Sequence, residues 1–90
     1  MLYMVIEKFR PGKVKSLYER LEREGRFIPE GVTFINSWID MDLKVCYQVM
    51  ESESREKLQQ WMDNWEGYCD WEVIPVMTSL EAKFKALRLP

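Results

Sequence analysis

The stretch Val32–Met50, VTFINSWIDMDLKVCYQVM, decides the fold because it contains two strands joined by a short turn. Residues 32–40 and 44–50 are both rich in β-branched and aromatic side chains, which is typical of strands. The connection Asp40–Leu43 between them is too short for a crossover and suits a hairpin. The centre of the chain is therefore predicted to be a β-hairpin.

A strand and a helix are expected before the hairpin. Residues 2–9 alternate two sets of side chains with a period of two, as a strand does. From Lys13 onward the apolar residues adopt helical spacing, and Gly25 can end that helix. The apolar start of the chain lacks the charged lead-in and the small-residue cleavage site of a signal peptide, so we expect a strand there.

A second helix and a fourth strand are expected after the hairpin. Ser52 or Ser54 can cap the helix, whose apolar residues fall at i, i+3, i+4 and i+7. These core positions are Leu58, Trp61, Met62 and Trp65. Residues 71–77 form the next strand, where Pro75 indicates an edge strand or a bulge. Thr78 begins a capping box for a short last helix.

The predicted order is β-α-β-β-α-β followed by a C-terminal helix. Right-handed crossovers place both main helices on one face of an antiparallel four-stranded sheet. The sequence therefore predicts an α+β, ferredoxin-like fold, with residues 1–90 forming a single domain. A chain of this length buries only about 60% of its unfolded surface, so association with another molecule would add to its stability.

Both faces of the predicted sheet are apolar, although two helices can cover only one of them. We assign these residues to the helix side: Leu2, Met4, Ile6, Ile35, Ile39, Val45, Tyr47 and Val49. The other face then collects Tyr3, Val5, Glu7, Phe34, Asn36, Trp38, Cys46, Gln48, Met50, Glu72 and Ile74. An uncovered apolar patch usually marks an interface or a ligand groove. We expect a symmetric homodimer with the two sheets packed face to face.

The register of the hairpin decides which side chains share a face. If Leu43 belongs to the turn, Asn36 and Gln48 lie opposite each other; with a two-residue turn, Ser37 faces Cys46 instead. We prefer the first register because it keeps the branched isoleucines of the first hairpin strand on the helix side.

Several motifs resemble a small bacterial family of uncharacterised domains in the dimeric α/β-barrel superfamily. They are Ser37–Asp40, Cys46–Glu51, Trp61, Trp65, Trp71–Val76 and Ser79. The resemblance covers residues 1–85 and implies a dimeric α/β barrel of no established activity. A more distant similarity, to antibiotic-biosynthesis-type monooxygenases and haem-degrading proteins, lies in the first and third strands. Those relatives have an asparagine, a tryptophan and a histidine ligand where this chain has Glu7, Met50 and no histidine, so such haem degradation is not expected.

The composition argues against several kinds of chemistry. The net charge is −2 with both signs interspersed, so we expect neither nucleic acid nor membrane as a partner. Histidine is absent, and no metal or cofactor is expected. Cys46 and Cys69 lack CxxC spacing and are expected as free thiols in the reducing cytoplasm. Cys46 has no basic neighbour in sequence to activate it as a nucleophile.

The candidate site residues belong to the face predicted to be uncovered. Glu72 is either a buried general base or a solvated carboxylate at a strand edge. Asn36 and Gln48 hold a carbonyl or enolate oxygen, or they bond each other. Trp38 is either a pocket wall or part of the dimer packing. The predicted ligand cavity is lined by Tyr3, Asn36, Trp38, Gln48, Met50 and Glu72.

Two functions fit these residues. In the first, the protein is a non-catalytic module that binds a small ligand or a partner. In the second, it is a cofactor-independent enzyme, monooxygenase-like or isomerase-like, that acts on a small aromatic or quinone-like molecule in the barrel cavity. We prefer the first, since the enzyme hypothesis depends on a distant similarity of fold.

Overall fold

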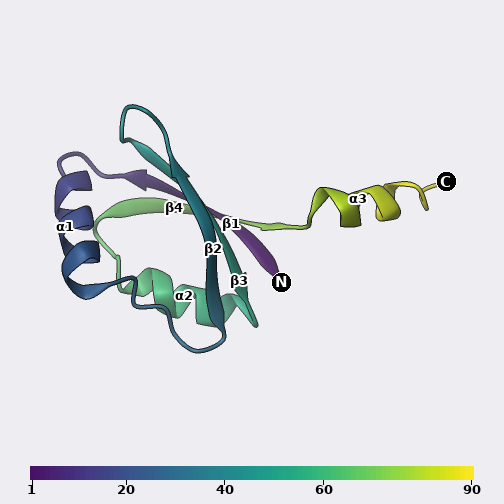
Figure 1. Ribbon diagram of the computed structural model, residues 1–90, viewed down its shortest axis with the longest axis horizontal. Coiled ribbons are helices and arrows are strands. Elements are labelled where there is room, and N and C mark those ends of the chain that lie inside the picture. Colours follow the sequence, from purple (N-terminus) through teal and green to yellow (C-terminus); the bar gives the residue numbers. More distant parts are fainter.

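The computed structural model describes residues 1–90 and confirms the predicted α+β, ferredoxin-like order of elements (Figure 1). One antiparallel sheet, in the order β2-β3-β1-β4, contains β1 (Leu2–Phe9), β2 (Val32–Ile39), β3 (Val45–Ser52) and β4 (Cys69–Val76). The helices are α1 (Val14–Glu24), α2 (Arg55–Asp63) and α3 (Ser79–Ala86). β4 is an edge strand, which accommodates Pro75 as predicted.

The helices α1 and α2 cover one face of the sheet and enclose the core. Nine buried side chains form it: Tyr3, Val5, Leu17, Val32, Met50, Leu58, Trp61, Met62 and Trp65. The predicted apolar stripe of α2 is thus confirmed as core. The helix is capped by Ser54, whose hydroxyl accepts a hydrogen bond from the Lys57 amide at 3.2 Å.

Helix α3 lies apart from this core. It projects from the end of β4 and lengthens the molecule to 49 Å (Figure 1). Its predicted capping box is present, since the Thr78 hydroxyl accepts from the Glu81 amide at 3.1 Å. None of its residues is buried, and Leu80 and Phe84 are more than half exposed. None of the three helices has the length and apolar character needed to cross a membrane.

The prediction of which residues the helices cover was wrong for β1 and β3, although Asn36, Trp38, Glu72 and Ile74 lie on the uncovered face as predicted. Tyr3, Val5 and Met50 lie under the helices, whereas Leu2, Met4 and Ile6 lie on the other face. The helix side also contains Phe34, Cys46 and Gln48. Alternation divides a strand into two sets of residues, but here both sets are apolar. The pattern therefore contained no information on which set faces inward.

The hairpin register also differs from both expected alternatives. Leu43 is in the turn as preferred, but a bulge at Ile35 shifts the pairing, so that Asn36 lies opposite Val49 and Ser37 opposite Gln48. The turn is held by Asp40, whose carboxylate accepts hydrogen bonds from the amides of residues 44 and 45 at 2.7 and 2.9 Å. The extra residue turns Asn36 away from Gln48 and places the two on opposite faces.

The face without helices is apolar, as the sequence predicted, although its residues are mostly different ones. We call it the open face and define it by Leu2, Met4, Ile6, Asn36, Trp38, Val45, Tyr47, Val49, Glu72, Ile74 and Val76. Trp38 is 55% exposed and Tyr47 is 43% exposed. An antiparallel sheet that faced water on this side would carry polar residues here.

Candidate functional site

A small pocket lies between the sheet and the two main helices. Its cavity volume is about 60 Å³. Its lining comprises Glu7, Phe9, Leu17, Tyr18, Leu21, Arg26, Ser37, Cys46, Gln48, Trp61 and Trp65. One water needs only roughly 10–15 Å³ of such volume, so the cavity has room for a few waters or for one small group of a ligand. We call it the Glu7 pocket.

Glu7 is the central polar group of this pocket. It is only 6% exposed, because β1 points it at the helices together with Tyr3 and Val5. Its carboxylate forms no ion pair and accepts no hydrogen bond from the protein. Burial raises the pKa of Glu7 from 4.5 to about 7, and the positive charge of Arg26 partly opposes that rise. Near neutral pH the group can therefore accept or donate a hydrogen bond.

Trp61 lines the same pocket, and its indole N–H is an unpartnered donor buried within the core. The residue is 2% exposed, and its buried indole Nε1 has no hydrogen-bond acceptor in the protein. Its ring is held by an edge-to-face contact with Trp71, with centroids 5.5 Å apart. A buried N–H without an acceptor costs about 1–3 kcal/mol.

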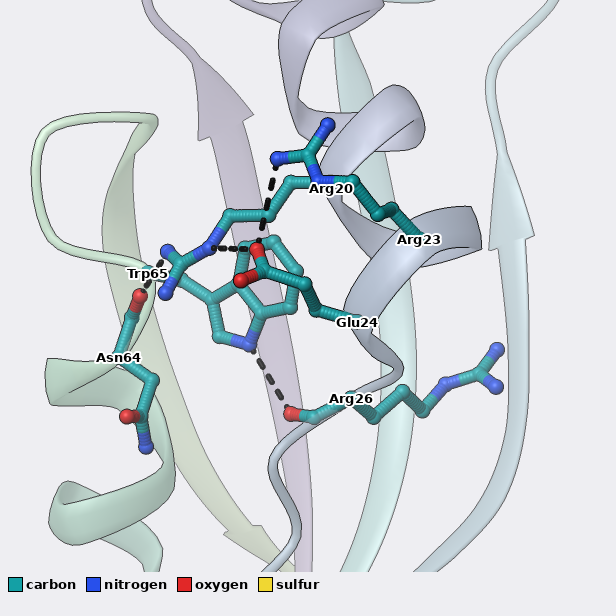
Figure 2. A network of polar contacts seen from close by, with 6 residues as sticks. All are labelled: Arg20, Arg23, Glu24, Arg26, Asn64 and Trp65. Carbon is teal, nitrogen blue, oxygen red and sulfur yellow. Dashed lines mark hydrogen bonds and ion pairs between the residues drawn. The ribbon is translucent and has the colours of Figure 1, made fainter.

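A network between α1, α2 and the following loop positions Arg26 (Figure 2). The Trp65 indole donates to the Arg26 carbonyl at 3.1 Å, in contrast to the free indole of Trp61. Arg20 pairs with Glu24 at 3.1 Å and also donates to the carbonyl of residue 64. The Arg26 guanidinium then lies 4.0 Å from the ring centre of Phe34. The loop that carries a pocket residue is thereby tied to both helices.

The other polar groups on the pocket floor are weakly engaged. Gln48 donates to the Met50 sulfur at 3.1 Å, and the Cys46 thiol lies 3.9 Å from the Gln48 oxygen. Burial, reinforced by the charge of Glu7, raises the pKa of Cys46 to about 12 and keeps the thiol protonated. Cys46 and Cys69 are both free and buried. No group of three or more carboxylate or thiol side chains gathers in a metal-binding arrangement.

The six residues predicted to line one cavity are divided between the two faces. Gln48 lines the Glu7 pocket, and Tyr3 and Met50 belong to the core on the same side of the sheet. Asn36, Trp38 and Glu72 lie on the open face, where all three are exposed. The cause is the bulge in β2 together with the reversed faces of β1 and β3. The predicted set therefore does not form one cavity within the chain.

Sequence reasoning missed Glu7, Arg26 and Trp61 as site residues. A usable signal was present for Glu7, since it is the single carboxylate among the apolar residues of β1. Once Tyr3 and Val5 are placed inward, a period of two places Glu7 inward as well. For Arg26 no local signal exists, because a loop basic residue reaches the pocket only through tertiary packing.

A family model described as Domain of unknown function (DUF3303) matches residues 1–88. The chain belongs to the DUF3303 family. This confirms the expected membership of a family of unknown function. No curated protein and no solved structure matches the chain significantly. The matched range includes the lining of the Glu7 pocket, the open face and α3, so all three are parts of the DUF3303 domain.

Proposed function

We propose that this DUF3303 protein is a small-ligand-binding module and that its binding site is the Glu7 pocket. One observation carries the proposal: the carboxyl group of Glu7 lines a small cavity, is only 6% exposed, and has neither an ion pair nor a hydrogen bond in the protein. Buried polar groups in folded proteins are almost always hydrogen-bonded. A ligand that bonds to Glu7 would satisfy this group.

A fragment screen read by NMR tests this proposal. The four tryptophan side chains give separate indole N–H signals, and that of Trp61 reports directly on the pocket. We expect some fragments to shift this signal and to bind Glu7→Leu about tenfold more weakly, because the carboxyl group is lost while the side chain stays similar in size. Glu72→Leu makes the same change on the open face and should not alter binding. A screen in which no fragment shifts the Trp61 signal would refute the proposal.

A second candidate function is a cofactor-independent isomerase, which the pKa of Glu7, about 7, favours over the monooxygenase-like alternative. The Glu7 carboxylate would take a proton from a carbon beside a ketone. The resulting enolate oxygen would accept a hydrogen bond from the Gln48 amide, and Glu7 would return the proton to another carbon. Conversion of 3-cyclohexenone to its conjugated isomer, followed by ultraviolet absorbance, tests this step. A rate no faster with the protein than with Glu7→Gln would eliminate the candidate.

We also propose that the open face packs against the same face of a second copy, as in a dimeric α/β barrel. Four strands of eight residues span roughly 26 by 19 Å, or about 500 Å² of flat area. A specific interface buries about 800 Å² per partner. The projecting α3, with Leu80 and Phe84 exposed, provides further apolar surface for contact with the partner. The area and the apolar character together support a symmetric dimer.

Light scattering of the purified protein tests the dimer. We expect a mass near twice the 10.9 kDa of one chain. Trp38→Asp should give monomer or insoluble protein, because it buries a charge in the interface. The matched control is Met41→Asp in the turn, where the side chain is 97% exposed, and it should leave the dimer intact. A mass of one chain at every concentration would contradict the dimer, and a stable Trp38→Asp dimer would contradict the choice of face.

We propose the cytoplasm as the location of the protein. Both cysteines are free thiols, which persist in a reducing compartment. Fractionation of cells that express the protein, followed by detection in each fraction, tests this; recovery from an oxidising compartment would contradict it.

A further inference from the structure

We infer that α3 is an exchanged arm: in each copy of the chain its apolar stripe packs into a groove at the root of α3 in a second copy. The stripe consists of Leu80, Phe84 and Leu87. This role of α3 rests on the dimer proposed above and specifies what the helix contacts there. It follows from the exposure of α3, from the groove beside it and from the charges of both.

Helix α3 lacks the packing that a short helix needs. It has eight residues, and isolated helices shorter than about 12–15 residues are marginal in water. The stripe has the spacing i, i+4 and i+7 of one helix face, yet none of the helix is buried and all three stripe residues are more than half exposed. The helix projects away from the rest of its own chain (Figure 1). Another molecule must therefore cover the stripe.

A groove suited to these side chains lies where α3 joins the sheet. Its volume is about 470 Å³, and its apolar lining is Met1, Leu2, Val76 and Met77. Leu2 and Val76 also belong to the open face, so the groove is continuous with the proposed interface. A cavity of about 150 Å³ holds a benzene ring, so the groove has room for the ring of Phe84 and a neighbouring leucine.

The groove cannot be filled by the α3 that borders it. Glu81, in the first turn of this helix, lines the groove. Phe84 and Leu87 lie about one and two turns further along a helix that leads away from the sheet (Figure 1). A two-fold axis along the strands places both grooves at the same end of the dimer, so each α3 can cross to the groove of the other copy. The exchange is then reciprocal, as a symmetric interface requires.

The charges of the arm and of the groove are complementary. The charged residues of the groove lining are Glu81 and Glu51, which also pairs with the Met1 amino group. Lys83 flanks the stripe, three residues after its first member and four before its last. Residues 78–90 contain three basic residues and one acidic residue, whereas residues 1–77 contain ten basic and fourteen acidic ones. A second copy thus offers both an apolar groove and the opposite charge.

Sedimentation equilibrium of the full chain and two variants measures the contribution of α3 to the dimer. Phe84→Asp should weaken dimerisation by about a hundredfold, because a buried phenylalanine is lost in both copies and each contributes about tenfold. Ala86→Asp is the matched control: it introduces the same charge two residues later, on the other side of the helix, and should change the dissociation constant by less than about threefold. Since no residue of α3 is buried in its own chain, both variants keep the core intact.

Photo-crosslinking identifies the surface that Phe84 contacts. Unlabelled and ¹⁵N-labelled full chains, both with p-benzoylphenylalanine at position 84, are mixed, and the crosslinked peptides are identified by mass spectrometry. We expect position 84 of one chain to be joined to a peptide of the other isotope that contains residues 1–2 or 76–77. A crosslink between the two isotopes can form only between two copies.

The outcomes separate the exchanged arm from the proposed dimer. Equal dimerisation of Phe84→Asp and Ala86→Asp would overturn the exchanged arm and leave the face-to-face dimer standing. Crosslinks confined to one isotope, or directed to any other surface, would do the same. If the unsubstituted protein is a monomer at every concentration, the dimer fails and the exchanged arm fails with it.

Discussion

Replacing Glu7 by glutamine should stabilise the protein, and increasingly so as the pH rises. Glu7 is 6% exposed, and burial raises its pKa from 4.5 to about 7. A difference of about 2.5 units between the folded and unfolded states corresponds to about 3 kcal/mol in the free energy of unfolding. Glutamine has nearly the same shape and no charge to bury.

The direction of the pH dependence follows from which state releases the proton first. Below about pH 4.5 the carboxyl group is protonated in both states, and its ionisation costs nothing. Between 4.5 and 7 the unfolded chain ionises while the folded protein keeps its proton, so the free energy of unfolding falls as the pH rises. Above pH 7 Glu7 ionises in the folded protein too. The decrease in the free energy of unfolding then stays constant at about 3 kcal/mol.

The assay is urea denaturation of both proteins at about pH 4, 6 and 8, followed by tryptophan fluorescence at one protein concentration. Subtracting the two curves removes the effect of every titrating group that they share. The advantage of Glu7→Gln should grow by about 3 kcal/mol from the lowest to the highest pH. A difference that does not change with pH would show that the Glu7 pKa is the same in both states. A difference that shrinks as the pH rises would show that the carboxylate is stabilised by a partner, and either result refutes the reasoning.

Three other predictions concern stability and reactivity. Leu58→Ala removes a fully buried side chain and should lower the free energy of unfolding by about 2–5 kcal/mol in urea denaturation, whereas Leu87→Ala, at a position 74% exposed, should change it by less than about 0.5 kcal/mol. Ser54→Ala deletes the cap of α2 and should cost about 1 kcal/mol in the same assay; an unchanged midpoint would contradict the capping role. Burial raises the pKa of Cys46 and of Cys69 to about 12, so neither thiol should react with a disulfide reagent until denaturant is added, and rapid colour without denaturant would disprove it.

Much of the fold was predictable because its signals are local. The hairpin at residues 32–52 and the stripe of α2 follow from side-chain periodicity, and the capping box at Thr78 follows from spacing. Handedness of the crossovers then leaves few topologies to consider. The order of elements and the edge position of β4 could therefore be derived without coordinates.

The candidate site was less predictable because it depends on which face of each strand is covered. β1 has apolar residues in both alternating sets, and Glu7 and Glu72 both looked like carboxylates in largely apolar strands. Only Glu7 is buried. The bulge at Ile35 likewise leaves no mark in the pattern, yet it places Asn36 opposite Val49, on the other face of the sheet from Gln48.

Local chemistry was enough to establish which elements form, where they end and how they follow one another, because periodicity, caps and turns act between residues close in the chain. It also established that one apolar sheet face must be left without a helix, since two helices cannot cover two faces. Tertiary packing alone decided that the buried face contains Glu7 and that Trp61 lines the same pocket. The reason is physical: the pKa of a carboxyl group and the partners of an indole N–H depend on desolvation and on neighbours distant in sequence.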